Sequence, residues 1–83
     1  MTEATLPGIE ELDALLAAVD RCEPADQAEF AHEHIQDARI YALGAMPREC
    51  EWSLELAQRT LAGMPASQES KRAREMLAEV FPG

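Results

Sequence analysis

Apolar residues recur every three or four positions along most of the chain, which is the spacing of one face of an α-helix. The first stripe of this kind is formed by Ile9, Leu12, Leu15, Leu16 and Val19. Pro24 disfavours helical geometry in the residue before it, so this helix should end near Cys22. The pattern predicts a first amphipathic helix that begins after Pro7.

A second helix is predicted from Asp26 to about Gly44. Asp26 is followed three residues later by Glu29, the spacing of a capping box. With Phe30 at zero on a helical wheel, the buried face falls between about 20° and about 140°. This arc contains Ala31, His34, Ile35, Ala38, Tyr41 and Ala42.

Two further helices complete the pattern. Pro47 suits the first position of a third helix, and Gly63 stops that helix. Its stripe is formed by Cys50, Leu54, Ala57, Leu61 and Met64. Ser67 is expected to cap a fourth helix, whose stripe is formed by Ala73, Met76, Leu77 and Val80, with Phe81 after it. The sequence predicts an all-α fold: one domain over residues 1–83, built as a compact bundle of four short, mostly antiparallel helices.

The composition supports a helical fold. Hydrophobic residues make up 47% of the 83 residues but aromatic residues only 5%, so the core must consist mainly of aliphatic side chains that favour helices over strands. A domain of this size has a thin core, because it buries only about 60 to 65% of the surface that its unfolded chain exposes.

The net charge of −9 is unevenly distributed. Residues 1–40 contain ten acids and two bases, whereas residues 41–83 contain six acids and five bases. An acidic surface repels phosphate backbones and anionic lipids, so we expect no nucleic-acid or membrane partner and instead a basic protein partner. The alternative is that the acids only keep the protein soluble. Lys71, Arg72 and Arg74 form the only basic cluster, interpreted as a solvated helix face in which Lys71 pairs with Glu75.

The two cysteines, Cys22 and Cys50, are too few for a disulfide scaffold and match no zinc-finger spacing. We expect reduced thiols in the core. No basic segment followed by an apolar run opens the sequence, and no stretch approaches the roughly 18 apolar residues of a membrane span. A cytoplasmic protein is therefore expected.

Glu29 and His32 form a Glu-x-x-His step, the spacing used by helical di-iron proteins. On the wheel these residues fall at about 260° and about 200°, opposite the apolar arc, so the step should point away from the core. A di-iron bundle also requires a second such step, and His34 is the only other histidine. The alternative to a protein without metal is a site assembled across a homodimer from Glu29, His32 and Glu33.

Catalytic chemistry finds no support in the sequence. Cys22 and Cys50 are potential nucleophiles, but no base or oxyanion hole is marked near either residue. We therefore predict no catalytic residue, no cofactor and no enzymatic activity.

Apolar residues also lie on the polar sides of two helices. Ile40 and Leu43 fall at about 280° and about 220° on the wheel of the second helix. Trp52 and Leu56 lie outside the stripe of the third. Either the third helix is central and Trp52 closes a far layer of the core, or these four residues form an exposed patch. Such a patch would bind a protein partner or a second copy of the chain.

The segment YALGAMPRECEWSLELA, followed by PASQESKRAREMLAE, resembles an uncharacterised bacterial family of small helical domains. That family has a stretch of the kind Ala-Leu-Pro-Arg-Glu-x-x-Trp-Trp before a polar turn and a basic, Ala-rich helix. The matching positions are Ala45, Met46, Pro47, Arg48, Glu49 and Trp52, with Ser53 in place of the second Trp. The resemblance implies a helical domain without an assigned activity, sometimes linked to secretion-type machinery.

The sequence thus predicts a small acidic adaptor, inhibitor or assembly factor that binds a protein partner through the apolar residues around Trp52. Homodimerisation through the same residues is a further expectation.

Overall fold

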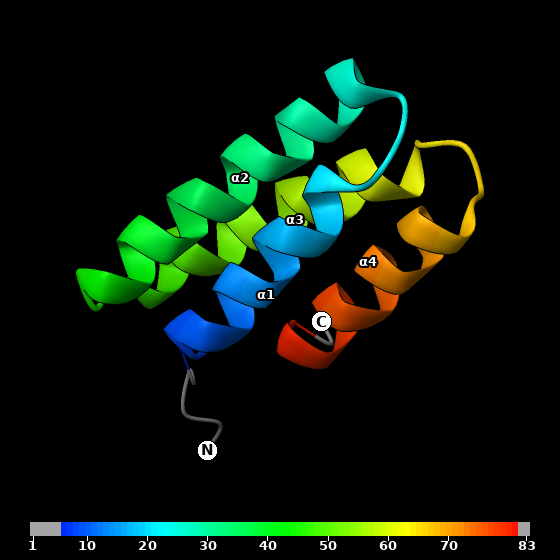
Figure 1. Cartoon of the computed structure of the whole chain (residues 1–83). Coiled ribbons are helices and arrows are strands. Elements are labelled where there is room, and N and C mark those ends of the chain that lie inside the picture. Colours follow the sequence, from blue (N-terminus) through cyan, green and yellow to red (C-terminus); the bar gives the residue numbers. More distant parts are fainter. Residues whose placement is uncertain (1–5, 82–83) are drawn as a thin grey trace.

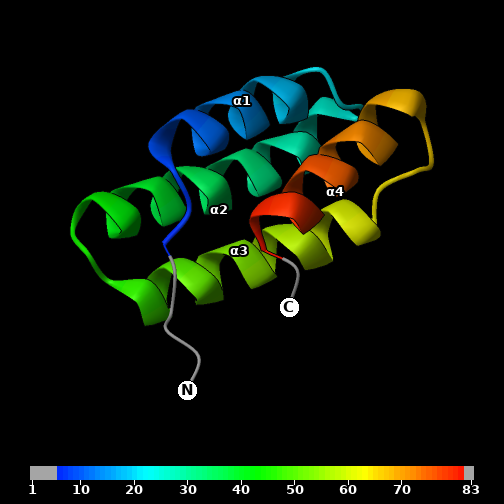
Figure 2. The ribbon, with the colours of Figure 1, turned by 90° about the horizontal axis from the view of Figure 1, so that it is seen from below.

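The computed structural model describes residues 6–81 and contains four α-helices in that range: α1 (Ile9–Asp20), α2 (Ala25–Leu43), α3 (Pro47–Ala62) and α4 (Gln68–Val80). Successive helices run in opposite directions (Figure 1). Each helix packs against two others, α1 and α3 both contacting α2 and α4 (Figure 2). The predicted fold class is confirmed, and the helix bounds lie within two residues of those predicted.

The core is built largely from the predicted stripes. In the predicted arc of α2, however, His34, Tyr41 and Ala42 are only half-buried, whereas Ala28, outside that arc, is buried. α2 and α3 share the most extensive interface, and α2 contributes mainly alanines to the core, which allow close approach of the two backbones. All the buried apolar residues of the described chain belong to one cluster, namely Leu12, Leu15, Val19, Cys22, Ala28, Ala31, Ile35, Ala38, Cys50, Leu54, Ala57, Leu61, Met64, Ala73 and Leu77. Since each of the four described helices has only two neighbours, none is central, and the prediction of a central third helix is wrong.

The predicted capping box of α2 is also wrong. The helix begins at Ala25 after Pro24, and no side chain of the described residues caps it. Asp26 already lies inside the first turn, where its carboxylate accepts only the backbone N–H of Gln27, at 3.0 Å. Because the helix starts two residues earlier than the motif implies, the carboxylate is past the position from which an N-cap reaches forward.

The start of α4 is capped as predicted by Ser67. Its hydroxyl accepts the backbone N–H of Ser70 at 3.0 Å, while the Ser70 hydroxyl accepts the backbone N–H of Ser67 at 2.9 Å. Ser70 is fully buried and its hydroxyl also donates to the carbonyl of Pro65. Both serines are therefore needed for this reciprocal cap.

The turn between α2 and α3 has the hydrogen bonds of a Schellman motif, from Met46 N–H to the carbonyl of Tyr41 and from Ala45 N–H to that of Ala42. This motif requires a left-handed residue, which is usually glycine. Here the residue with positive φ is Ala45, at 54°, whereas Gly44 before it has φ of −84°. The glycine stands one position away from where its conformational freedom is needed.

Arg74 connects α4 to the end of α3. Its guanidinium donates to the carbonyl of Leu61 at 2.9 Å and to that of Met64 at 2.8 Å. These carbonyls lie at the C-terminal end of α3, where partners within the helix are lacking. The prediction that Arg74 belongs to a solvated basic face is therefore wrong, and among residues 6–81 no ion pair joins Lys71 to Glu75.

Candidate protein-binding surface

Large apolar side chains are exposed on α2, on α3 and in the turn between them. Trp52 is 61% exposed, and Ile40 and Leu43 are each 63% exposed. Leu56 is half-buried. Because Trp52 lies mostly in solvent, the interpretation that it closes a far layer of the core is wrong.

Two more exposed apolar residues, Phe30 and Met46, were not among the predicted surface residues. Phe30 lies only about 20° outside the predicted apolar arc, but the buried residues of α2 centre at about 120° on the same wheel. Phe30 thus lies about 120° from the middle of the core, outside the buried face. An arc drawn around the buried alanines alone would have identified it.

Two side-chain contacts show which side of α2 faces α1. Nε2 of His32 lies 3.3 Å from Oδ1 of Asp20, and Nε of Arg39 lies 2.8 Å from Oδ1 of Asp13. Since α1 occupies this side and α3 packs on the other, the remaining face of α2 is directed to solvent.

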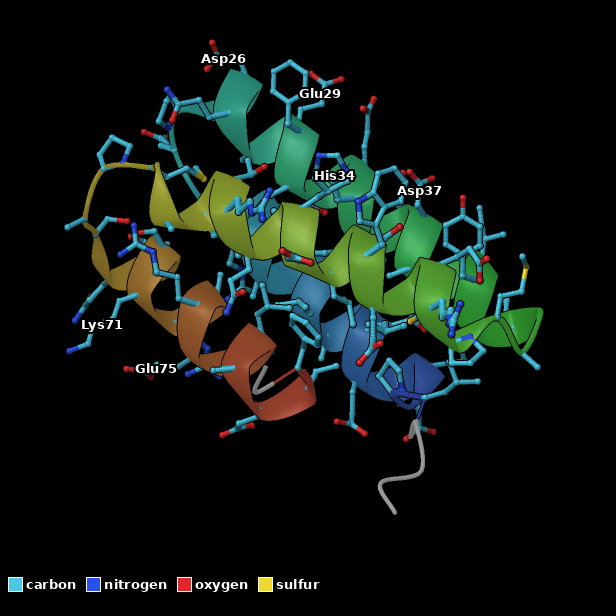
Figure 3. The ribbon with its side chains drawn as sticks, turned by 180° about the vertical axis from the view of Figure 1, so that it is seen from behind. Asp26, Glu29, His34, Asp37, Lys71 and Glu75 are labelled. Atoms are coloured by element: carbon cyan, nitrogen blue, oxygen red, sulfur yellow. The ribbon has the colours of Figure 1, made fainter. Side chains whose placement is uncertain are left out.

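We call this face the outer stripe of α2 and define it by its exposed residues Asp26, Glu29, Glu33, Asp37, Ile40 and Leu43. They follow one another at steps of three or four residues, the spacing of one helix face. Figure 3 shows Asp26, Glu29 and Asp37 along the outer edge of α2, whereas Lys71 and Glu75 extend from α4 at the opposite edge of the molecule. The stripe is acidic toward the N-terminal end of α2 and apolar toward its C-terminal end.

The candidate metal ligands are not gathered into a site. His32 is half-buried against α1 and pairs with Asp20, so the prediction that its imidazole faces solvent is only partly correct. Glu29 and Glu33 are exposed on the outer stripe. Among residues 6–81, no group of three or more His, Cys, Asp or Glu side chains is arranged to hold a metal ion.

Both cysteines are free thiols of the core, as expected. Burial raises the pKa of the Cys22 thiol, as does the neighbouring Glu69 carboxylate, while Arg74 opposes the shift. Burial likewise raises the pKa of Cys50, with a smaller contribution from Glu51. Both thiols are therefore held in the protonated form, which is a poor nucleophile.

An open groove of about 490 Å³ lies between α1 and the start of α4. Its lining includes the bases Arg21, Lys71 and Arg72 but also the acids Glu69 and Glu75. Opposite charges on the same walls give the groove no preference for an anion or a cation. The exposed residues of α2 and α3 are thus the stronger candidate for a functional surface.

In the part of the chain that the structure describes, no helix combines the length and apolar character required to cross a bilayer. Comparisons of the chain with models of protein families, with curated proteins and with solved structures found no match.

Proposed function

We propose that this chain is a non-enzymatic protein-binding module, acting as an adaptor, inhibitor or assembly factor, and that its partner contacts Trp52, Leu56, Ile40 and Leu43. The observation that carries the proposal is the exposure of Trp52, which is 61% accessible in a small protein whose core is filled without it. Tryptophan is enriched among the residues that dominate binding energy at protein interfaces.

The geometry of the surface fits an interface of modest size. Ile40, Leu43 and Met46 follow one another at three-residue steps through the last turn of α2 and the connection to α3. Trp52 lies one to two turns into α3 and is directed away from the core, about 200° from Cys50 on the wheel. A partner that covers both helix surfaces buries several large side chains, each contributing about 1.5 to 3 kcal/mol when fully removed from water.

The proposal is tested with three immobilised proteins: wild type, Trp52→Ala and Glu51→Ala. Glu51 is the exposed neighbour of Trp52 and serves as the matched control. Lysate of the cells that naturally express the protein is passed over each, and the retained proteins are quantified by mass spectrometry. We expect a partner that wild type and Glu51→Ala retain equally and that Trp52→Ala binds about thirtyfold more weakly, since an interface tryptophan contributes about 2 kcal/mol or more.

Equal retention by all three proteins would contradict the proposal. Because a second copy of the chain is also a potential partner, sedimentation velocity of the same three proteins over a wide concentration range separates self-association from binding of another protein. Association that Trp52→Ala abolishes would identify the partner as a second copy.

A further inference from the structure

We infer that the outer stripe of α2 binds a cationic amphipathic helix of the partner, with basic side chains over its acidic end and apolar side chains over Ile40 and Leu43. This inference rests on the proposed function and specifies the chemistry of the partner.

The charge of the stripe is unusual for a helix surface. Asp26, Glu29, Glu33 and Asp37 follow one another at steps of three, four and four residues, so each carboxylate neighbours another of the same charge. Like charges at this spacing destabilise a helix by about 0.2 to 0.5 kcal/mol per pair. Within residues 6–81 none of these four acids forms an ion pair. Asp26 lies in the first turn of α2, where a negative charge is favourable, but the fold gains nothing from the three acids that follow it.

Elsewhere in the molecule, some acidic side chains are paired with arginines. Glu55 is followed four residues later by Arg59, and the two form an ion pair at 2.7 Å. Asp13 is neutralised by Arg39, so the only arginine of α2 is engaged by α1 and not by the acids of the stripe. Four of the twelve acids within residues 6–81 that pair with neither an arginine nor a histidine lie together on this one stripe. A positively charged partner supplies the missing counter-charges there.

The dimensions of the stripe match a helix. From Asp26 to Leu43 the stripe spans about 26 Å at about 1.5 Å per residue, or between four and five turns. Its apolar end continues into the exposed Met46 of the following turn. A partner helix of similar length therefore meets four carboxylates at one end and apolar side chains at the other.

A second copy of this chain fits the stripe poorly. Side-by-side parallel packing of two stripes places carboxylates against carboxylates, and antiparallel packing places the carboxylates of each copy against Ile40 and Leu43 of the other. Both arrangements bury charge without compensation. Nucleic acid and anionic lipid are repelled by the same four acids.

The probe for the test is a synthetic peptide of about 18 residues, enough for a helix as long as the stripe. Four lysines and then two leucines occupy one of its faces, and alanine and glutamine occupy the others. A scrambled peptide of identical composition, in which these residues do not share a face, is the control. Binding of each fluorescein-labelled peptide to the full chain is measured by fluorescence anisotropy at low and at physiological salt.

Two charge-reversal variants locate the binding. Glu29→Lys with Glu33→Lys alters the stripe, and Glu75→Lys with Glu79→Lys changes the net charge equally but on exposed positions of α4. We expect the first pair to weaken peptide binding about tenfold or more and the second about threefold or less, because close opposite charges contribute more than distant ones. Circular dichroism confirms that both variants remain folded.

The inference is overturned if the scrambled peptide binds equally well, if both variants weaken binding to the same extent, or if the lysine–leucine peptide does not bind. Peptide binding that responds to Trp52→Ala but to neither charge variant also overturns it, while leaving the proposed function intact. The opposite outcome is also distinguishable. If the stripe variant loses peptide binding while wild type and Trp52→Ala retain the partner equally, the role proposed for Trp52 is contradicted and the inference about the stripe still holds.

Discussion

At the scale of single residues, Arg74 shows how one side chain can join two helices. Its guanidinium donates to two backbone carbonyls at the end of α3 while its own backbone belongs to α4. α3 and α4 share the smallest of the four helix interfaces, so these hydrogen bonds add to a contact between the two helices that is otherwise limited. Arginine suits this role because its planar group presents several donors at once.

We expect Arg74→Met to lower the free energy of unfolding by about 1.5 to 3 kcal/mol, since hydrogen bonds from a charged group are lost and the carbonyls remain partly buried. Arg72→Met, at an exposed position of the same helix, should change the free energy of unfolding by less than about 0.5 kcal/mol. Urea unfolding followed by circular dichroism measures both values. Equal effects of the two substitutions would contradict the role given to Arg74.

The thiols give a second prediction at this scale. Because the folded-state pKa of Cys22 and Cys50 is raised, the folded protein holds these protons more tightly than the unfolded chain. Their contribution to stability is complete below the unfolded thiol pKa of about 8.5 and is lost as pH rises beyond it. The free energy of unfolding should therefore fall as the pH rises above about 8.5.

The measurement is urea unfolding at a series of pH values for wild type and for Cys50→Ala. The variant should be less stable at neutral pH, because a buried side chain is shortened, but should lose less stability on raising the pH. Parallel pH curves for the two proteins would show that Cys50 does not carry the effect.

At the scale of helices and turns, the connection between α2 and α3 places alanine where the backbone is left-handed. That conformation costs a residue with a Cβ about 1 to 2 kcal/mol, part of which is offset because alanine is less flexible than glycine in the unfolded chain. Gly44, by contrast, has a backbone conformation that any residue adopts, and a Cβ added there would meet its nearest neighbour at an ordinary 3.6 Å.

Both exchanges should therefore stabilise the protein, for opposite reasons. Ala45→Gly removes backbone strain and should add about 0.5 to 1 kcal/mol to the free energy of unfolding. Gly44→Ala restricts the unfolded chain and should add about 0.4 to 1 kcal/mol. Thermal and urea unfolding measure the two, and destabilisation by Ala45→Gly would argue against the left-handed turn.

The outer stripe of α2 carries a prediction about stability as well as binding. Glu33 has an acidic neighbour four residues away on each side, Glu29 and Asp37. Removing its charge by Glu33→Gln relieves both repulsions and should stabilise the protein by about 0.4 to 1 kcal/mol. Glu55→Gln, which breaks the ion pair with Arg59, should destabilise it slightly. The two values are obtained from urea unfolding at low salt, and the same sign for both would contradict this account of the stripe.

At the scale of the whole molecule, a net charge of −9 on 83 residues produces general self-repulsion in the folded state. Among residues 6–81, the ion pairs of Arg39 with Asp13 and of Arg59 with Glu55 oppose this repulsion only locally. The acidic character supports solubility and the approach of a basic partner, but it lowers the stability of a domain whose core is thin.

Raising NaCl from about 0.02 to about 0.5 M shortens the Debye length and should stabilise the protein by several tenths to about 1 kcal/mol. A variant with Glu33→Gln and Asp37→Asn should respond less, because two of the repelling charges are absent. Thermal unfolding at both salt concentrations provides the measurement. A fall in stability with salt would mean that the ion pairs outweigh the repulsion.

The sequence by itself predicted the four helices because their apolar periodicity and the prolines and glycines between them act locally. Pro47 and Ser67 mark helix starts through their own backbone and side-chain chemistry, and both were correctly placed. The capping box predicted at Asp26 is wrong because the same spacing of residues also occurs within a helix. Only the observed helix start at Ala25 excludes Asp26 as the N-cap.

The exposure of the candidate surface required the fold. The helical wheel separated Ile40 and Leu43 from the apolar arc. It left open whether Trp52 faced a far layer of the core or solvent, because the surroundings of Trp52 depend on which helices lie beside α3. The pairing of His32 with Asp20 and the hydrogen bonds from Arg74 to the end of α3 join residues distant in the sequence. Periodicity determines which face of a helix is apolar, whereas only tertiary packing decides what that face, and the one opposite, will meet.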